Sequence, residues 1–122
     1  MNSKDFEKRL IRFATRVFNL SEKLPTSIIG KHLGAQIIRS ASSPALNYGE
    51  AQAAESREDF LHKMKICLKE LRETSVCLKL ISERNWFPDE KLNSIIQEND
   101  ELVSIFVAST KTISKNKINR KS

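Results

Sequence analysis

Residues 37–51, with the sequence IIRSASSPALNYGEA, are the stretch that decides the fold. Small and polar side chains interrupt a plain helical pattern here, and Pro44 and Gly49 lie inside what should be a helix. Proline has no backbone N–H, so Pro44 removes the helical hydrogen bond to the carbonyl of Ser40 and favours a kink. We predict one continuous, kinked helix, with two shorter helices as the alternative.

The predicted helix around this stretch begins near Thr26 or Ser27, either of which can cap it, and ends near Ala54. Its apolar residues recur at helical spacing and form one predicted buried stripe: Ile29, Leu33, Ile37, Ala41 and Ala45. Because the alanines and a nearby glycine, Gly34, are small, we expect a neighbouring helix to pack closely against this one.

Three further segments show apolar residues at the same spacing. The first runs from Ser3, a candidate N-cap, to the residue before Pro25, which stops the helix. The third opens at Ser56 with a variant of the capping box. The fourth follows Pro88, a residue favoured at the first position of a helix, and runs to about Ser114.

Four helices with short connections predict an all-α, antiparallel up-down-up-down four-helix bundle. We expect residues 1–114 to form this one domain, and residues 115–122, which lack periodicity, to form a basic, disordered tail. The composition agrees, since 39% hydrophobic and 30% charged residues with three glycines and three prolines suit a soluble helical protein.

The third segment carries apolar residues on two faces. One face is a sustained core stripe made of Phe60, Met64, Cys67, Leu71, Ser75 and Leu78. The second face carries Ile66, Cys77 and Leu80. A helix with two apolar faces is covered on two sides, so these three residues predict an oligomer interface.

The sequence has no run of about 18 apolar residues, which predicts that no helix spans a membrane. Its N-terminal residues contain no apolar signal core, so we expect a cytoplasmic location. Cys67 and Cys77 stand ten residues apart on one predicted helix, roughly 15 Å along its axis. That separation is too large for a disulfide bond between them, and we expect two reduced thiols.

The formal net charge of +6 is unevenly distributed, with +4 in residues 1–53, −3 in residues 54–110 and the rest in residues 111–122. Basic residues gather on one arc of the first segment: Lys8, Arg9, Arg12, Arg16 and Lys23. Cations at positions i, i+4 and i+8 can follow a phosphate backbone, which predicts a nucleic-acid-binding surface. The alternative is a solvated helix face, which Asp5 within the arc favours.

Residue types that form active sites or metal centres are scattered. His32 and His62 lie on different predicted helices, with neither the spacing of a zinc site nor the Glu-x-x-His pairs of di-metal bundles. The glycines are isolated, so no phosphate-binding loop is present. The sequence therefore predicts no catalytic residue, no cofactor, no metal and no small-molecule substrate.

Five polar residues predict a network that holds the second and third helices in register: Arg39, Asn47, Glu50, Glu70 and Glu73. Glu70 and Glu73 stand one helical turn apart, near the level at which Arg39 should pass. A catalytic role for these carboxylates would require a pocket and a partner base, and the sequence indicates neither.

A family resemblance is carried by the order and spacing of residues 39–51, Ala54, Ser56, Asp59, Phe60, Lys63 and residues 68–74. The chain resembles the four-helix-bundle proteins encoded by intervening sequences of bacterial 23S ribosomal RNA genes. That family includes the accessory variability determinant of diversity-generating retroelements. The resemblance covers the whole length, although NYGEA replaces the commoner NIAEG of the family and points to a subfamily.

The resemblance implies a homopentamer of bundles that forms a barrel with a central channel. In the retroelement branch it implies a basic barrel that engages a reverse transcriptase and nucleic acid. Two-faced helices and the uneven charge agree with a ring of protomers in which unlike surfaces meet. We therefore expect a non-enzymatic homo-oligomer that binds RNA or an RNA-handling protein through a basic face. The alternative is a protein-interaction scaffold without nucleic-acid affinity.

Overall fold

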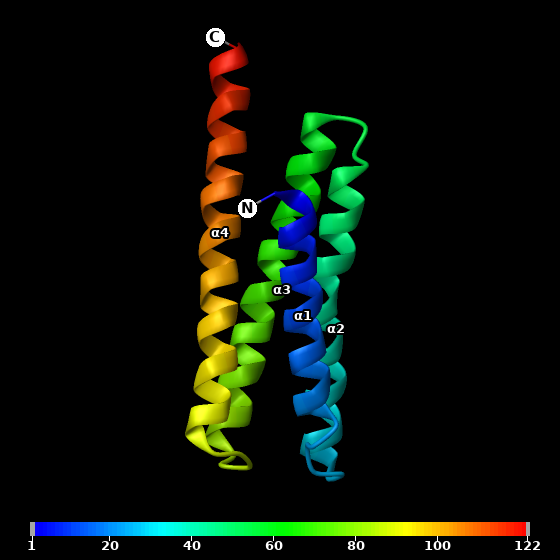
Figure 1. The fold of residues 1–122 in the computed structure, drawn as a ribbon, viewed down its shortest axis with the longest axis vertical. Helices are drawn as coiled ribbons and strands as arrows, with labels where there is room; N and C mark the ends of the chain where they lie inside the picture. The colour runs from blue at the N-terminus through cyan, green and yellow to red at the C-terminus, as the bar shows by residue number, and fades with distance from the viewer. Residues whose placement is uncertain (1, 122) are drawn as a thin grey trace.

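A computed structural model describes residues 2–121, with the backbone alone over residues 116–121. The described residues form four helices: α1 (Ser3–Ser21), α2 (Ile28–Gln52), α3 (Arg57–Glu83) and α4 (Asp89–Lys121). Consecutive helices run in opposite directions and are joined by short turns (Figure 1). The predicted all-α, up-down-up-down bundle is therefore confirmed. Within residues 2–121, no helix is both long enough and apolar enough to cross a bilayer.

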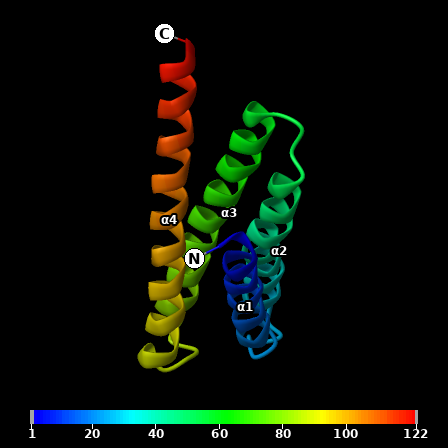
Figure 2. The ribbon, with the colours of Figure 1, turned by 45° about the horizontal axis from the view of Figure 1, so that its top comes forward.

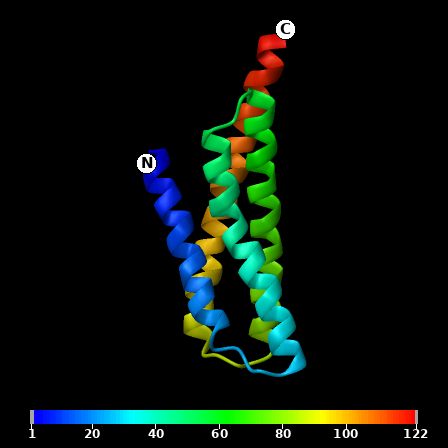
Figure 3. The same ribbon diagram turned by 90° about the vertical axis from the view of Figure 1, so that its right-hand side faces the viewer.

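Each helix packs against two neighbours. The α2–α3 contact is the most extensive, α3 also packs against α4, and α1 packs against α2 and, more loosely, α4. In consequence α1 and α3 lie on opposite sides of the bundle, as Figure 3 shows. α4 continues past the predicted boundary at Ser114 and projects beyond the other three helices (Figures 1 and 2).

Side-chain caps set the beginnings of three helices. The Asn2 side chain accepts a hydrogen bond from the backbone N–H of Asp5 at 2.9 Å, so the predicted cap at Ser3 is wrong by one residue. Ser27 caps α2, which selects one of the two predicted positions, and Ser56 caps α3 as predicted. Each cap satisfies an N–H group that has no partner inside its helix.

The helix α2 is continuous through Pro44, which confirms one helix and excludes the alternative of two shorter ones. A hydroxyl group of α2 and a thiol group of α3 donate hydrogen bonds to backbone carbonyls near Pro44. The Ser42 hydroxyl donates to the carbonyl of Ile38 at 2.7 Å, and the Cys67 thiol of α3 donates to the carbonyl of Pro44 at 3.4 Å. These bonds add to the backbone pairing of the Ile38 and Pro44 carbonyls, whereas the carbonyl that loses its N–H donor to the proline is that of Ser40.

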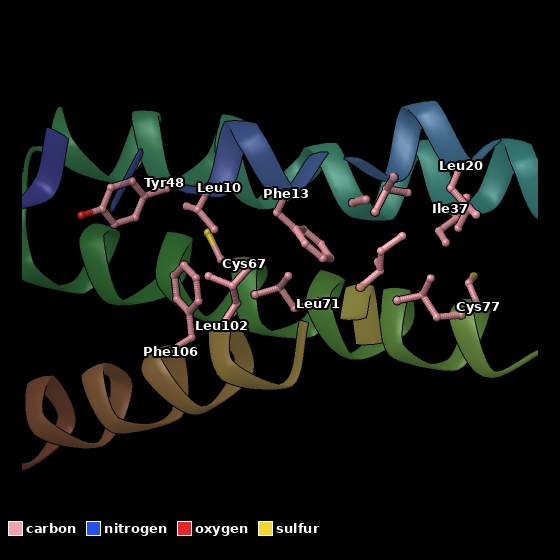
Figure 4. Packing of buried hydrophobic residues seen from close by; sticks show 14 of the residues in the cluster. Leu10, Phe13, Leu20, Ile37, Tyr48, Cys67, Leu71, Cys77, Leu102 and Phe106 are labelled. Atoms are coloured by element: carbon pink, nitrogen blue, oxygen red, sulfur yellow. The ribbon is translucent and has the colours of Figure 1, made fainter. Parts of the chain in front are cut away.

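An aromatic cluster joins three helices at one end of the core. Phe6 of α1 lies edge-on to Tyr48 of α2, with ring centroids 5.0 Å apart, and its ring lies 5.4 Å from that of Phe106 of α4. Figure 4 shows Tyr48 and Phe106 at one end of the row of buried side chains that includes Cys67 and Leu71. Aromatic pairs at these distances stabilise the fold beyond the area they bury.

The first turn of α2 departs from the predicted buried stripe. Ile29 is 43% exposed, whereas Gly30 is buried beneath the turn that connects α1 to α2. A Cβ atom at position 30 would lie 1.9 Å from the carbonyl oxygen of Pro25. The prediction for Ile29 is therefore wrong, because the backbone of the turn covers a surface one residue further along the helix.

Arg39 of α2 binds two carboxylates of α3. Its Nη1 donates to Glu70 Oε2 at 2.7 Å, and its Nη2 pairs with Glu73. Glu70 is only 8% exposed, so its charge depends on this partner. One residue along α2, the hydroxyl of Ser40 forms a buried hydrogen bond of 2.9 Å with that of Thr74.

The other two members of the predicted network form separate contacts. Asn47 donates to the carbonyl of Ser43 at 3.0 Å within α2, and Lys63 donates to Glu50 at 3.0 Å across the α2–α3 pair. Asn47 stands about 12 Å along the helix axis from Arg39, which is too far for a shared hydrogen bond. The prediction of a single network is corrected to an Arg39 cluster and two local contacts.

We expect Gly30→Ala to lower the free energy of unfolding by roughly 1–3 kcal/mol, because the new methyl group would displace the Pro25 carbonyl. Gly34→Ala is the matched control, since its Cβ would lie at an ordinary 3.5 Å from Leu24 Cδ1. Its better helix propensity should leave stability unchanged or raise it by up to about 1 kcal/mol. Thermal denaturation followed by circular dichroism measures both. Equal melting temperatures for the two variants would contradict the assigned contact.

Arg39→Ala should destabilise the bundle by roughly 1–3 kcal/mol, since it leaves the buried Glu70 carboxylate without its cation. Adding Glu70→Gln removes that charge and should restore part of the loss. Urea denaturation of the wild type, both single variants and the double variant measures the coupling between the two residues. Purely additive effects would show that the ion pair does not contribute to stability.

Candidate nucleic-acid and oligomer interfaces

The predicted basic arc lies on the outer side of α1, and two of its residues, Arg9 and Arg16, reach α4 at the edge where the two helices meet. The apolar residues of α1 point into the core, which turns Lys8, Arg12 and Arg16 towards solvent. Lys23, in the turn after α1, is also exposed. These four cations therefore share one side of the bundle and are available to a ligand.

Arg9 differs from the rest of the arc because it connects α1 to α4. Its Nε and Nη2 donate to the two carboxylate oxygens of Glu98 at 2.9 and 2.7 Å, and Nη2 also donates to Glu101 at 3.0 Å. The hydrogen bond to Glu98 raises the pKa of the Arg9 guanidinium and lowers that of the carboxylate. This bidentate pairing makes Arg9 a structural contact and removes it from the predicted binding set.

The edge gains a cation from α4 that the sequence did not single out. The neighbouring Lys23 lowers the pKa of Lys91, so two groups of like charge lie close to each other. Arg16 reaches the same helix and donates to the Ser94 hydroxyl at 2.8 Å. An anion near Lys23 and Lys91 would relieve their repulsion, which makes this end of the edge the more favourable position for a phosphate.

The predicted tail is described only in part. Lys111 and Lys115 are exposed on α4. The side chains of Lys117, Arg120 and Lys121 lie outside the described residues.

The predicted oligomer interface requires one correction. Cys77 is 6% exposed and packs in the core of its own chain, because its position on α3 faces α2. Burial raises the pKa of its thiol. Ile66 is half-buried, and Leu80 is 49% exposed. Of the three predicted residues, Leu80 therefore offers the most apolar surface to another chain.

Apolar surface around Leu80 extends onto α2 at the end of the bundle that holds the α1–α2 turn. Ile28 is 89% exposed there, and Ile29 lies next to it. An open groove of about 410 Å³ runs between the two helices, lined by Ile28, Ile29, His32, Leu33, Leu80 and Arg84. Exposed aliphatic side chains gathered at one place are typical of a contact surface.

A second groove and the two thiols are chemically unreactive. A groove of about 450 Å³ between α2, α3 and α4 is lined by neutral residues: Tyr48, Gln52, Phe60, Met64, Ala108, Ser109, Thr112 and Ile113. Burial raises the pKa of Cys67 to about 12, so its thiolate is scarcely populated at neutral pH. Among the described residues, no three metal-ligating side chains cluster together.

A search of curated proteins finds no match to this chain. Among solved structures, the bundle resembles a crystal structure of a protein with unknown function from the S23 ribosomal protein family of Bacteroides thetaiotaomicron. The two share 29% sequence identity and superpose with a TM-score of 0.79, over 91% of this chain and 99% of the other.

The family comparison agrees with the structural one. Residues 4–108, which span all but the first residue of α1 and most of α4, match the 23S rRNA-intervening sequence protein family. The resemblance carried by residues 39–74 is thus confirmed over nearly the whole bundle. The chain belongs to the 23S rRNA-intervening sequence protein family.

Proposed function

We propose that this protein is a non-enzymatic, self-associating bundle that binds RNA through the exposed cations of the α1–α4 edge. The observation that carries the proposal is the line of Lys8, Arg12 and Arg16, which continues to the like-charged pair Lys23 and Lys91. The family name, which refers to intervening sequences of 23S rRNA, is consistent with an RNA partner.

The spacing of these cations suits a chain of phosphates. Lys8 and Arg16 are separated by about 12 Å along α1, and Arg12 stands midway between them. Each exposed cation that meets a phosphate releases a condensed counterion, which makes binding favourable at low salt and steeply dependent on ionic strength. Arg9 does not add to this effect, because Glu98 and Glu101 already balance its charge.

Self-association is proposed through the apolar groove at Leu80, Ile28 and Ile29. Burying aliphatic surface of this kind contributes about 25 cal/mol per Å². A ring of five copies is the assembly that the family resemblance implies. An assembly repeats the α1–α4 edge in every protomer and multiplies its avidity for a long RNA.

Replacing Arg12 and Arg16 together by glutamine should reduce the salt dependence of RNA binding by nearly two counterions, at about 0.7–0.9 per lost phosphate contact. Fluorescence anisotropy with a labelled structured RNA, measured over a series of salt concentrations, gives this slope. The variant Lys31→Gln with Arg57→Gln removes the same charge from other exposed positions and serves as the control. A wild type that recovers a partner from nuclease-treated lysate but binds no RNA would favour the scaffold alternative.

We expect Leu80→Glu to lower the mass of the assembly, since a carboxylate in the groove would have to be desolvated on association. Light scattering coupled to size-exclusion chromatography measures that mass. Ile11→Glu makes the same kind of change on α1, where the side chain is equally exposed, and should leave the assembly intact. A monomeric wild type, or an unchanged mass for Leu80→Glu, would rule out this groove as the interface.

A further inference from the structure

The outer surface of α3 carries a second basic region, separate from the α1–α4 edge. Lys65, Lys69, Arg72 and Lys79, termed here the α3 face, recur at spacings of four, three and seven residues. At about 100° per residue these positions fall on one side of the helix. All four side chains are exposed, and they lie opposite the residues that α3 buries in the core.

Neighbouring residues of α4 extend this surface. Lys111 and Lys115 line an open groove of about 450 Å³ together with Lys65 and two hydroxyl-bearing residues, Thr110 and Ser114. Nearer the other end, Asp100 lines a groove of about 330 Å³ with Arg72 and Lys79. The lining of the two grooves thus combines five cations with one carboxylate, so the surface as a whole is positive.

The α3 face and the α1–α4 edge are separated by the bundle itself. α1 and α3 occupy opposite corners, with α2 and α4 between them (Figure 3). The cations of both basic surfaces are exposed. At about 0.1 M salt, charges separated by more than about 10 Å are largely screened from each other. The two surfaces therefore act as independent sites, and one straight backbone segment cannot contact both.

We propose that the α3 face, extended by Lys111 and Lys115, is a second binding surface for the phosphate backbone of double-stranded RNA. One bundle then holds two backbone segments on opposite sides. The inference rests on the proposed RNA binding and adds a separate site to it.

Chemistry selects a duplex over the other ligands. Lys65 and Lys79 are separated by about 21 Å along a straight helix, which presents a rigid row of cations. Single-stranded RNA is held largely by stacking on aromatic side chains, and this row contains none. A protein partner would require apolar anchors, and Val76 is the one exposed aliphatic residue within the row. Duplex RNA is recognised through its shape and its phosphates, which the α3 face can meet.

The test is the number of duplexes bound per chain. An RNA duplex of about ten base pairs is comparable in length to the α3 face and is short enough to occupy one surface at a time. Calorimetric titration should give two duplexes per wild-type chain. Lys69→Gln with Arg72→Gln should weaken one of the two sites by about tenfold or more at 0.1 M salt, since two phosphate contacts are lost. Arg12→Gln with Arg16→Gln should weaken the other site, and the control Lys31→Gln with Arg57→Gln should retain both.

The outcomes separate the two proposals. One duplex per chain, weakened by the Arg12 and Arg16 changes but not by those at Lys69 and Arg72, would overturn the α3 site and leave the proposed function standing. A wild type that binds no duplex would overturn both. Binding weakened only by the Lys69 and Arg72 changes would support the α3 site and move RNA binding away from the α1–α4 edge. Tighter binding of a single strand of equal length would overturn the assignment to a duplex.

A gain of affinity provides a second test that misfolding cannot imitate. Asp100→Asn removes the carboxylate beside Arg72 and Lys79 and should tighten duplex binding at the α3 face about threefold at low salt. The α1–α4 site should keep its affinity. If Asp100→Asn left both sites unchanged, phosphates would not approach this part of α3 and the proposed surface would be wrong.

Discussion

The close packing of α2 against α3 is the constraint on which the rest of the structure depends. Small side chains at Ser40 and Ala41 allow the two backbones to approach, and the hydroxyl of Thr74 and the thiol of Cys67 bond to groups of α2 inside the contact. Arg39 closes the outer edge of the pair by neutralising Glu70. With this pair fixed, α1 and α4 complete the core by covering its open side.

This order of packing explains why the basic residues divide into two surfaces. α1 and α4 meet loosely, and the bidentate pairing of Arg9 with Glu98 holds their edge together. Glu98 and Glu101 of α4 pair with Arg9, whereas Lys8, Arg12 and Arg16 of α1 stay exposed. α3 lies at the opposite corner, with its outer side in solvent, so the basic residues that it carries are separated from those of α1 by the full width of the core.

Much of the fold follows from the sequence alone. Apolar periodicity and the prolines at 25 and 88 locate the four helices. The spacing of Arg39, Glu70 and Glu73 indicates that the second helix packs against the third. Periodicity does not predict burial correctly where another segment of the chain packs over the helix. Ile29 is exposed because the α1–α2 turn covers Gly30, and Cys77 is buried because α2 covers a wider arc of α3 than one apolar stripe suggests.

The basic surfaces show the same limit. Helical spacing alone identifies the basic arc on α1. That Arg9 is paired and Lys91 joins the exposed cations depends on α4, which is remote in sequence. The row on α3 has helical spacing as clear as that on α1. Its acidic neighbours in the chain, such as Glu70 and Glu73, hide its charge until the structure shows that they point towards Arg39.

Asn99 fixes the register of α4 along α3. This fully buried side chain of α4 donates to the carbonyl of Leu71 at 3.0 Å, while its Oδ1 has no hydrogen-bond partner among the described residues. Leucine and isoleucine seams are tolerant of slippage, since one aliphatic layer resembles the next. Sliding α4 by one turn would strand the whole amide among aliphatic groups, at a cost of roughly 1–3 kcal/mol. The unpaired Oδ1 of Asn99 lowers the stability of the bundle, while the hydrogen bond of its amide disfavours the arrangement in which α4 is shifted by one turn.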